Sequence, residues 1–212
     1  RPVADMKALD GLSCNDMVLG PDGRGYVGSF QELDEDRLPG PGNMPAFSHI
    51  HLVEPDPDQP GQGRCRTVAD RMTFPNGPVI TPDGKTYLVA ETFANRITAF
   101  DIEADGSLSN RRVWADLGAP TDGMTLDEEG CLWVAIPYYA YGGPGGFVRV
   151  REGGELVDRI DADGVGSFAC TLGGPELKSL FLLQSTILGV ERSPGDGRIM
   201  VAEVDVPGLG TP

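Results

Sequence analysis

The chain has 212 residues, of which 40% are hydrophobic, so it is long enough to bury one large core or two small ones. Its 30 glycines and 18 prolines favour many turns over long helices. The formal net charge of −15 argues against nucleic acid as a partner, because phosphates require a basic surface, and against docking on anionic membranes.

From the N-terminus the chain reads as a series of strand–turn–strand pairs. Each pair joins a short apolar strand, a turn containing glycine or proline, and a second strand rich in aromatic and aliphatic residues. The four pairs are "CNDMVLGPDGRGYVGSF", "PNGPVITPDGKTYLVAET", "TDGMTLDEEGCLWVAIP" and "GSFACTLGGPELKSLFLLQS". Their second strands are predicted to begin, at spacings of 61, 45 and 48 residues, near Tyr26, Tyr87, Leu132 and Leu180. The chain therefore contains an internal repeat.

Further strands are predicted between these pairs. They are "SHIHLVE" and "CRTVADR", then "RITAFDI" and "RRVWADL", then "GFVRVRE" and "GELVDRIDA", and finally "TILGVER" and "RIMVAEV". Four antiparallel strands in about 45 residues are typical of a β-propeller blade. The longer first interval is explained by inserted loops at Leu38–Asn43 and Glu54–Gly63. The sequence thus predicts an all-β propeller, and a β-sandwich, which seldom repeats at this length, is the alternative.

A polar residue stands six positions before the turn in every repeat. These residues are Asn15, Asn76, Asp122 and Ser167. Because the innermost strand of each blade lines the central channel, equivalent positions should converge near the axis. Carboxylate and amide oxygens suit a hard cation such as Ca²⁺, Mg²⁺ or Mn²⁺. Taken singly, each Asn-Gly or Asp-Gly pair also fits an ordinary turn cap.

No run of eighteen apolar residues is present, so the sequence predicts no transmembrane helix. No secretory leader is visible, which favours a cytoplasmic location, although the chain opens on Arg1 rather than methionine. The four cysteines show no spacing typical of a zinc site. His49 and His51 alternate on one strand and project from one face, and both a zinc pair and a structural role remain open for them.

The sequence resembles the family of gluconolactonase, senescence marker protein (regucalcin) and related sugar lactonases. The resemblance is carried by "FPNGPVITPDGKTYLVAETFANRITAFDIEADGSLSNRRVWADL", "PTDGMTLDEEGCLWVA", "FACTLGGPELKSLFLL" and "NDMVLGPDGRGYVGS". It implies a six-bladed propeller that holds one divalent metal ion at the channel mouth, with Ca²⁺ as the first expectation and Zn²⁺, Mn²⁺ or Mg²⁺ as alternatives. It also implies hydrolysis of a small-molecule lactone by metal-activated water.

The resemblance assigns roles to three residues. Asn76 and Asp122 match the family's metal-binding asparagine and aspartate, and Asp122 is also the favoured general base or acid. Asn15 matches an asparagine that contacts the substrate close to the metal. Two alternatives stay open: a related propeller that hydrolyses aryl esters or organophosphates with the same metal, and a non-catalytic propeller that binds calcium.

Two departures from the family pattern stand out. The family's remaining metal ligand, a glutamate ahead of an "EGP"-like segment in the first blade, has no counterpart in this sequence. Residues 1–212 are therefore expected to form a single propeller domain of about four blades that lacks roughly the first two. Ser13 stands where some members carry an arginine that holds substrate, which leaves the substrate preference open.

Overall fold

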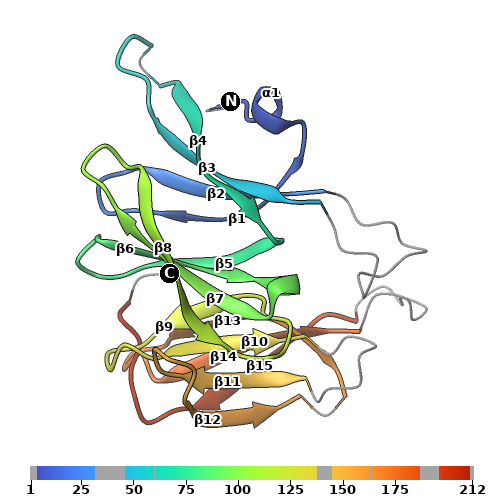
Figure 1. Cartoon of the computed structure of the whole chain (residues 1–212). Helices are drawn as coiled ribbons and strands as arrows, with labels where there is room; N and C mark the ends of the chain where they lie inside the picture. Colours follow the sequence, from blue (N-terminus) through green and yellow to red (C-terminus); the bar gives the residue numbers. More distant parts are fainter. Residues whose placement is uncertain are drawn as a thin grey trace.

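The computed structural model describes residues 4–31, 46–59, 61–137, 145–162, 164–186 and 196–210. Strands dominate these residues, and the two helices among them, α1 (Lys7–Asp10) and η1 (Thr92–Ala94), are each a single turn (Figure 1). The predicted all-β class is confirmed. Within the described ranges, no helix is long and apolar enough to cross a lipid bilayer.

Fifteen described strands form four antiparallel sheets, and within each sheet the spatial order follows the chain. The first sheet contains β1 (Ser13–Leu19), β2 (Gly25–Phe30), β3 (Ser48–Pro55) and β4 (Gly63–Met72). The second contains β5 (Pro75–Ile80), β6 (Thr86–Glu91), β7 (Arg96–Ile102) and β8 (Leu108–Asp116). The third contains β9 (Met124–Leu126), β10 (Leu132–Ile136), β11 (Gly146–Val150) and β12 (Leu156–Asp161). The fourth contains β13 (Gly166–Gly173), β14 (Ser179–Ser185) and β15 (Arg198–Glu203).

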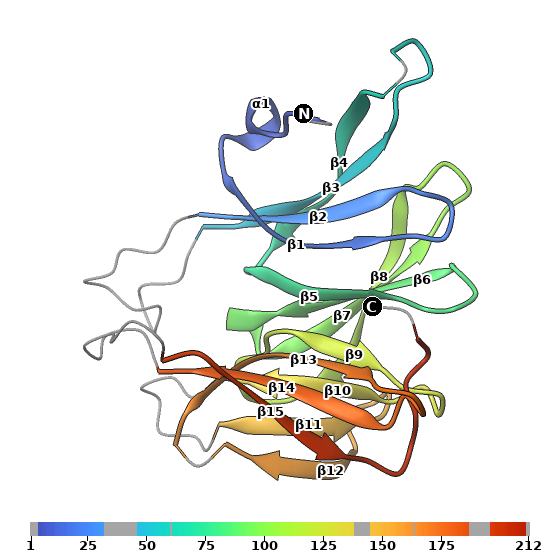
Figure 2. The ribbon, with the colours of Figure 1, turned by 180° about the vertical axis from the view of Figure 1, so that it is seen from behind.

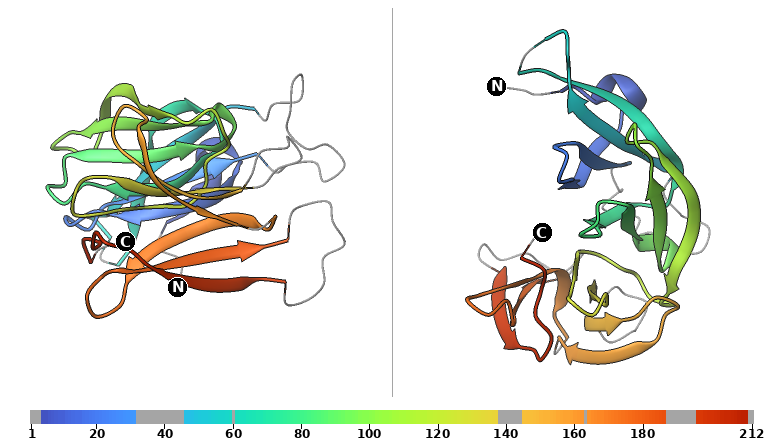
Figure 3. Two further views of the ribbon diagram at one scale, coloured as in Figure 1. Left: turned by 90° about the horizontal axis from the view of Figure 1, so that it is seen from below. Right: turned by 90° about the vertical axis from the view of Figure 1, so that its left-hand side faces the viewer.

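The four sheets are the blades of a propeller, as predicted. Their first strands follow one another, with β1 beside β5, β5 beside β9, and β9 beside β13. Figures 1 and 2 show the sheets in succession, and the right-hand view of Figure 3 shows that they form an open arc rather than a closed ring. The predicted strand "TILGVER" lies, apart from Thr186, outside the described residues.

Three of the four repeats turn in the same way. The backbone N–H groups of Gly23, Gly84 and Gly130 donate to the carbonyl oxygen three residues earlier, and these glycines have φ angles of 81°, 70° and 74°. Glycine adopts this left-handed conformation without the steric cost that a side chain would impose. In the fourth repeat Leu177 takes the left-handed position, with a φ of 55°.

The core lies between neighbouring sheets, and the middle strands are buried on both faces. Successive residues of a strand point to opposite faces, so Tyr87 packs toward the first sheet while Leu88 packs toward the third. In the same way Leu132 packs toward the second sheet and Trp133 toward the fourth. All four side chains are at most 1% exposed. This explains why the second strand of each repeat is almost continuously hydrophobic.

A buried carboxylate ties the strands of the second sheet together. Glu91, at the end of β6, is fully buried, and its Oε1 accepts hydrogen bonds from Thr98 at 2.5 Å and from Arg96 at 2.8 Å. Arg111 donates to the same oxygen at 3.0 Å, and the backbone N–H of Thr73 donates to Oε2 at 2.9 Å. Burial alone would raise the pKa of Glu91, but these hydrogen bonds and charges outweigh it and lower the pKa.

Replacing Glu91 with glutamine is expected to destabilise the fold by ~3 kcal/mol, because two arginines then lose a buried partner. Since the pKa of Glu91 is depressed on folding, its contribution is present above the ordinary glutamate pKa and is lost as the pH falls through the lowered value. The difference in melting temperature between the two proteins should therefore shrink in acid. Glu155→Gln, which removes an exposed partner of Arg151, is the matched control and should change nothing measurable.

Candidate functional site

The first two inner strands meet at the residues that the sequence singled out. The side-chain Nδ2 of Asn15 donates a hydrogen bond to the carbonyl oxygen of Pro75 at 2.9 Å. The next residue, Asp16, accepts a hydrogen bond on Oδ2 from the backbone N–H of Gly77 at 3.1 Å. The "ND" pair of the first sheet is thus held against the Asn-Gly pair of the second sheet.

Similar backbone contacts join the innermost strand of the second sheet to that of the third, and the third to the fourth. A Cβ atom on Gly77 would lie 2.5 Å from the carbonyl oxygen of Asp122, so the two backbones touch. The N–H of Gly123 donates to the carbonyl oxygen of Phe168 at 2.9 Å, and a Cβ on Gly123 would lie 2.7 Å from Cα of Ala169. The structure therefore brings the four equivalent segments together in blade order.

The inner strands are irregular at the predicted positions. The pairing register shifts between residues 14 and 17 in β1, between 76 and 79 in β5, and between 167 and 169 in β13. In the third sheet Asp122 lies just before β9, where its backbone N–H donates to Ala135 at 3.0 Å. A β-bulge re-aims a side chain out of the regular alternation, and such bulges concentrate near active sites. At these bulges the side chains of the polar residues leave the strict alternation between the two faces of the sheet that a regular strand would impose.

Asn76 is nearly buried and its amide is held by local contacts. Its Nδ2 lies 3.4 Å from Oγ1 of Thr92, a fully buried residue at the start of η1. Its Oδ1 accepts a hydrogen bond from the backbone N–H of Gly77 at 3.2 Å. The same N–H also donates to Asp16, so the amide oxygen of Asn76 and the carboxylate of Asp16 share one donor.

Asp122 lies in an environment that disfavours an isolated negative charge. Its burial and the negative charge of Asp16 raise the pKa of Asp122 well above its ordinary value, and a hydrogen bond from the Gly123 N–H opposes this only in part. A cation placed beside these two carboxylates would stabilise their ionised forms. Carboxylate oxygens and the amide oxygen of Asn76 are donors of the kind that Ca²⁺, Mg²⁺ and Mn²⁺ prefer.

Ser167 occupies the equivalent position in the fourth sheet. Its side chain is fully buried, and its Oγ has no hydrogen-bond partner among the residues that the structure describes. A buried hydroxyl without a partner costs free energy, so such groups usually have a functional or solvent-filled explanation. Its position at the equivalent point of β13 makes it part of the same candidate site.

Sequence reasoning missed two residues of this site. Asp16 was passed over although it directly follows Asn15, and the signal was available because a second carboxylate in an "ND" pair is an obvious oxygen donor. Thr92 had no such signal, since it follows β6 and reaches Asn76 only through the pairing of β5 with β6.

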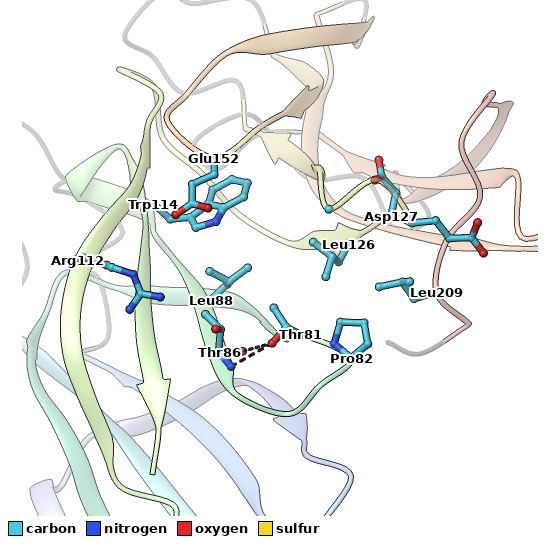
Figure 4. Close-up of a pocket in the computed structure, with 12 residues that line it drawn as sticks. Thr81, Pro82, Thr86, Leu88, Arg112, Trp114, Leu126, Asp127, Glu152 and Leu209 are labelled. Atoms are coloured by element: carbon cyan, nitrogen blue, oxygen red, sulfur yellow. Dashed lines mark hydrogen bonds between the residues drawn. The ribbon is translucent and has the colours of Figure 1, made fainter.

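A separate cavity of about 310 Å³ lies at the turn end of the second and third sheets (Figure 4). Its apolar lining includes Leu88, Trp114, Leu126 and Leu209, and Glu152 also borders it. None of the predicted site residues contributes to its lining. Asp127, which does, already bonds Arg149 at 2.7 Å, so this cavity is not the predicted site.

Fold and site together define a β-propeller protein in which polar residues lie together where the innermost strand of each blade begins. The family model of the SMP-30/Gluconolactonase/LRE-like region matches residues 1–186. The chain belongs to this family, as the sequence motifs predicted.

Curated relatives carry two kinds of name. Regucalcin from Xenopus laevis is 30% identical over 119 residues, which are 53% of this chain and 38% of the relative. Diisopropyl-fluorophosphatase from Loligo vulgaris is 29% identical over 101 residues, which are 42% of this chain and 32% of the relative. The chain thus matches less than half the length of either relative.

Solved structures extend the similarity to almost the whole chain. A calcium-binding regucalcin from Agrobacterium tumefaciens superimposes with a TM-score of 0.75 at 21% identity, covering 99% of this chain and 67% of that protein. A gluconolactonase from Xanthomonas campestris gives a TM-score of 0.61 at 25% identity, covering 81% of this chain and 54% of that protein. These similarities support the propeller fold over nearly the whole chain.

Proposed function

We propose that this protein hydrolyses small lactones at the site formed by Asn15, Asn76 and Asp122. The observation that carries the proposal is the meeting of the inner strands at these positions, together with the two carboxylates at one place. Membership of the family and the similarity to a gluconolactonase favour a lactone over other esters. The substrate class is a small-molecule, gluconolactone-like cyclic ester.

Asn76 and Asp122 would hold a divalent cation, with Ca²⁺ as the first choice because every donor is an oxygen. A bound dication would supply polarisation of the lactone carbonyl and a lower pKa for nearby water. Asn76 contributes a neutral oxygen, so the positive charge would be left to stabilise the oxyanion. Asn15, on the neighbouring strand, would orient the substrate.

Asp122 would move the proton of the reaction. As water attacks the carbonyl carbon, its proton passes to the Asp122 carboxylate. When the ring C–O bond breaks, the same proton passes to the leaving alkoxide, and the product is a hydroxy acid. Asp16 would act beside it, because its charge already changes the proton affinity of Asp122.

The open arc supports a proposal about the whole domain. This chain covers 67% of the Agrobacterium regucalcin, which is the share that four blades would take of the six-bladed ring that the family resemblance implies. On that basis residues 1–212 would correspond to the last four blades of one propeller domain. The glutamate that completes the family's metal site would then lie in a blade outside this sequence.

Removing the metal tests the proposed function. The full-length protein, treated with EDTA and then with Ca²⁺, Mn²⁺, Mg²⁺ or Zn²⁺, is expected to lose and regain hydrolysis of D-gluconolactone, measured as proton release at constant pH. Restored turnover by at least one of the ions supports the proposal. Turnover that survives chelation would contradict the metal-dependent mechanism.

A second candidate function rests on the similarity to diisopropyl-fluorophosphatase. The same site could then act on organophosphates or aryl esters. A panel that compares a sugar lactone, phenyl acetate and a fluorophosphate with the same preparation separates the two enzymes by their kcat/KM values. Tight Ca²⁺ binding with no turnover of any of the three would instead favour a non-catalytic calcium-binding propeller.

A further inference from the structure

A cluster of three metal-ligating side chains lies away from the candidate active site. His49 and His51, two positions apart on β3, face Asp10 at the end of α1. Oδ2 of Asp10 is 2.9 Å from Nδ1 of His49 and 2.9 Å from Nε2 of His51. One ligand atom from each of the three residues lies within 4.8 Å of the other two, which is close enough to surround a single ion.

The cluster lies on the face of the first sheet that points away from the second sheet. Ser29 also donates to Oδ2 of Asp10, at 2.8 Å, and it faces away from the second sheet. Its neighbour Phe30 points the other way and packs on Phe74, which precedes β5. The candidate active site lies on that second side, where Asn15 bonds the second sheet. The two sites are therefore on opposite faces of the first sheet.

The three side chains are held in place. His51 is 1% exposed, the Asp10 side chain is 7% exposed, and the His49 side chain is 30% exposed. The second ring nitrogen of His51, Nδ1, is 3.1 Å from Oγ1 of Thr67. A metal-binding histidine is usually oriented in this way by a partner on its other nitrogen. The other carboxylate oxygen of Asp10, Oδ1, accepts a hydrogen bond from the backbone N–H of Leu12 at 3.0 Å, which fixes the orientation of the carboxylate.

The donor set differs in kind from that of the active site. Two imidazole nitrogens and one carboxylate oxygen favour Zn²⁺, Co²⁺ or Ni²⁺, whereas Ca²⁺ requires oxygen donors. We propose that Asp10, His49 and His51 form a second metal site, specific for a transition-metal dication. Without the metal, His49 donates from Nδ1 and His51 donates from Nε2 to the ionised Asp10.

Metal binding at this site releases no proton, because Asp10 is already ionised and each ring keeps its one proton, but it changes where that proton sits. The ion takes Nδ1 of His49 and Nε2 of His51, so the remaining ring proton of each moves to the other nitrogen. His51 then carries its proton on Nδ1 and donates it to Thr67. Both histidines therefore change tautomer when the metal binds, which a merely hydrogen-bonded cluster does not require.

Both histidines of residues 1–212 belong to the cluster, and their ring signals are assigned by their loss in His49→Gln and His51→Gln variants. In ¹⁵N-labelled full-length protein that is first saturated with Ca²⁺, one equivalent of Zn²⁺ is expected to shift the ring nitrogens of both His49 and His51. The ¹⁵N chemical shifts should report the change of tautomer in each. Absence of these shifts at one equivalent of Zn²⁺ would overturn the proposal.

Two variants keep the test independent of folding. Asp10→Asn keeps the shape of the side chain but removes its charge, and it is expected to weaken Zn²⁺ binding at least tenfold. Asp158→Asn, the same change at an exposed position of β12, is the matched control and should leave the affinity unchanged. If Asp10→Asn and the unmodified protein bound Zn²⁺ with equal affinity, the cluster would have only a structural role and the proposal would be wrong.

Discussion

Replacing Asp122 with asparagine is expected to lower kcat/KM for lactone hydrolysis roughly 10³-fold, the usual contribution of a general acid–base group. Asparagine has nearly the same shape, so the close contact between Gly77 and the Asp122 backbone is preserved. It cannot take a proton from water, and it brings no charge to a cation. Initial rates of proton release with D-gluconolactone, at saturating metal, measure the effect.

Two comparisons make this result specific. Asp158→Asn, on the exposed outer strand β12, should retain full activity and shows that the loss does not follow from the substitution itself. The melting temperature of Asp122→Asn should not fall, because the variant removes a buried charge whose pKa is already raised by burial. Full activity in Asp122→Asn would refute the assigned role.

Replacing Gly77 with alanine is expected to destabilise the fold by ~3 kcal/mol or more, because the new methyl group has no room. Its Cβ would lie 2.5 Å from the carbonyl oxygen of Asp122, 2.7 Å from Cα of Gly123 and 2.8 Å from the N of Met124. All three are backbone atoms, which cannot rotate away. For a chain of this length the melting temperature should drop by about 10 °C.

Two other glycines separate crowding from backbone strain. Gly118 has a φ of 61°, but a methyl group on its Cα would meet no atom within 4 Å, so Gly118→Ala reports the strain of a positive φ alone, about 1 kcal/mol. Gly197 has neither a positive φ nor a near neighbour, and its replacement should be neutral. If Gly77→Ala proved as stable as Gly118→Ala, β5 and the segment before β9 would not approach each other as closely as described.

The strands and turns could be read from the sequence because their causes are local. Second strands predicted near Tyr26, Tyr87, Leu132 and Leu180 begin at residues 25, 86, 132 and 179. A Pro-Asp-Gly turn and a continuous apolar run each act within a few residues, so their effect survives without knowledge of the rest of the chain. The constant register of Asn15, Asn76 and Asp122 likewise follows from repetition of one local unit.

The contacts that make the sites were decided only by the tertiary structure. Asn15 reaches a partner 60 positions away, and Gly77 approaches Asp122 through the packing of separate sheets. Asp10 meets His51 across 41 positions, so neither periodicity nor spacing pointed to the third member of that cluster. The sequence thus determined which polar residue stands at the start of the innermost strand of each blade. The order and closeness of the sheets determined which of them touch, because burial of the apolar faces, and not any local preference, sets how the blades pack.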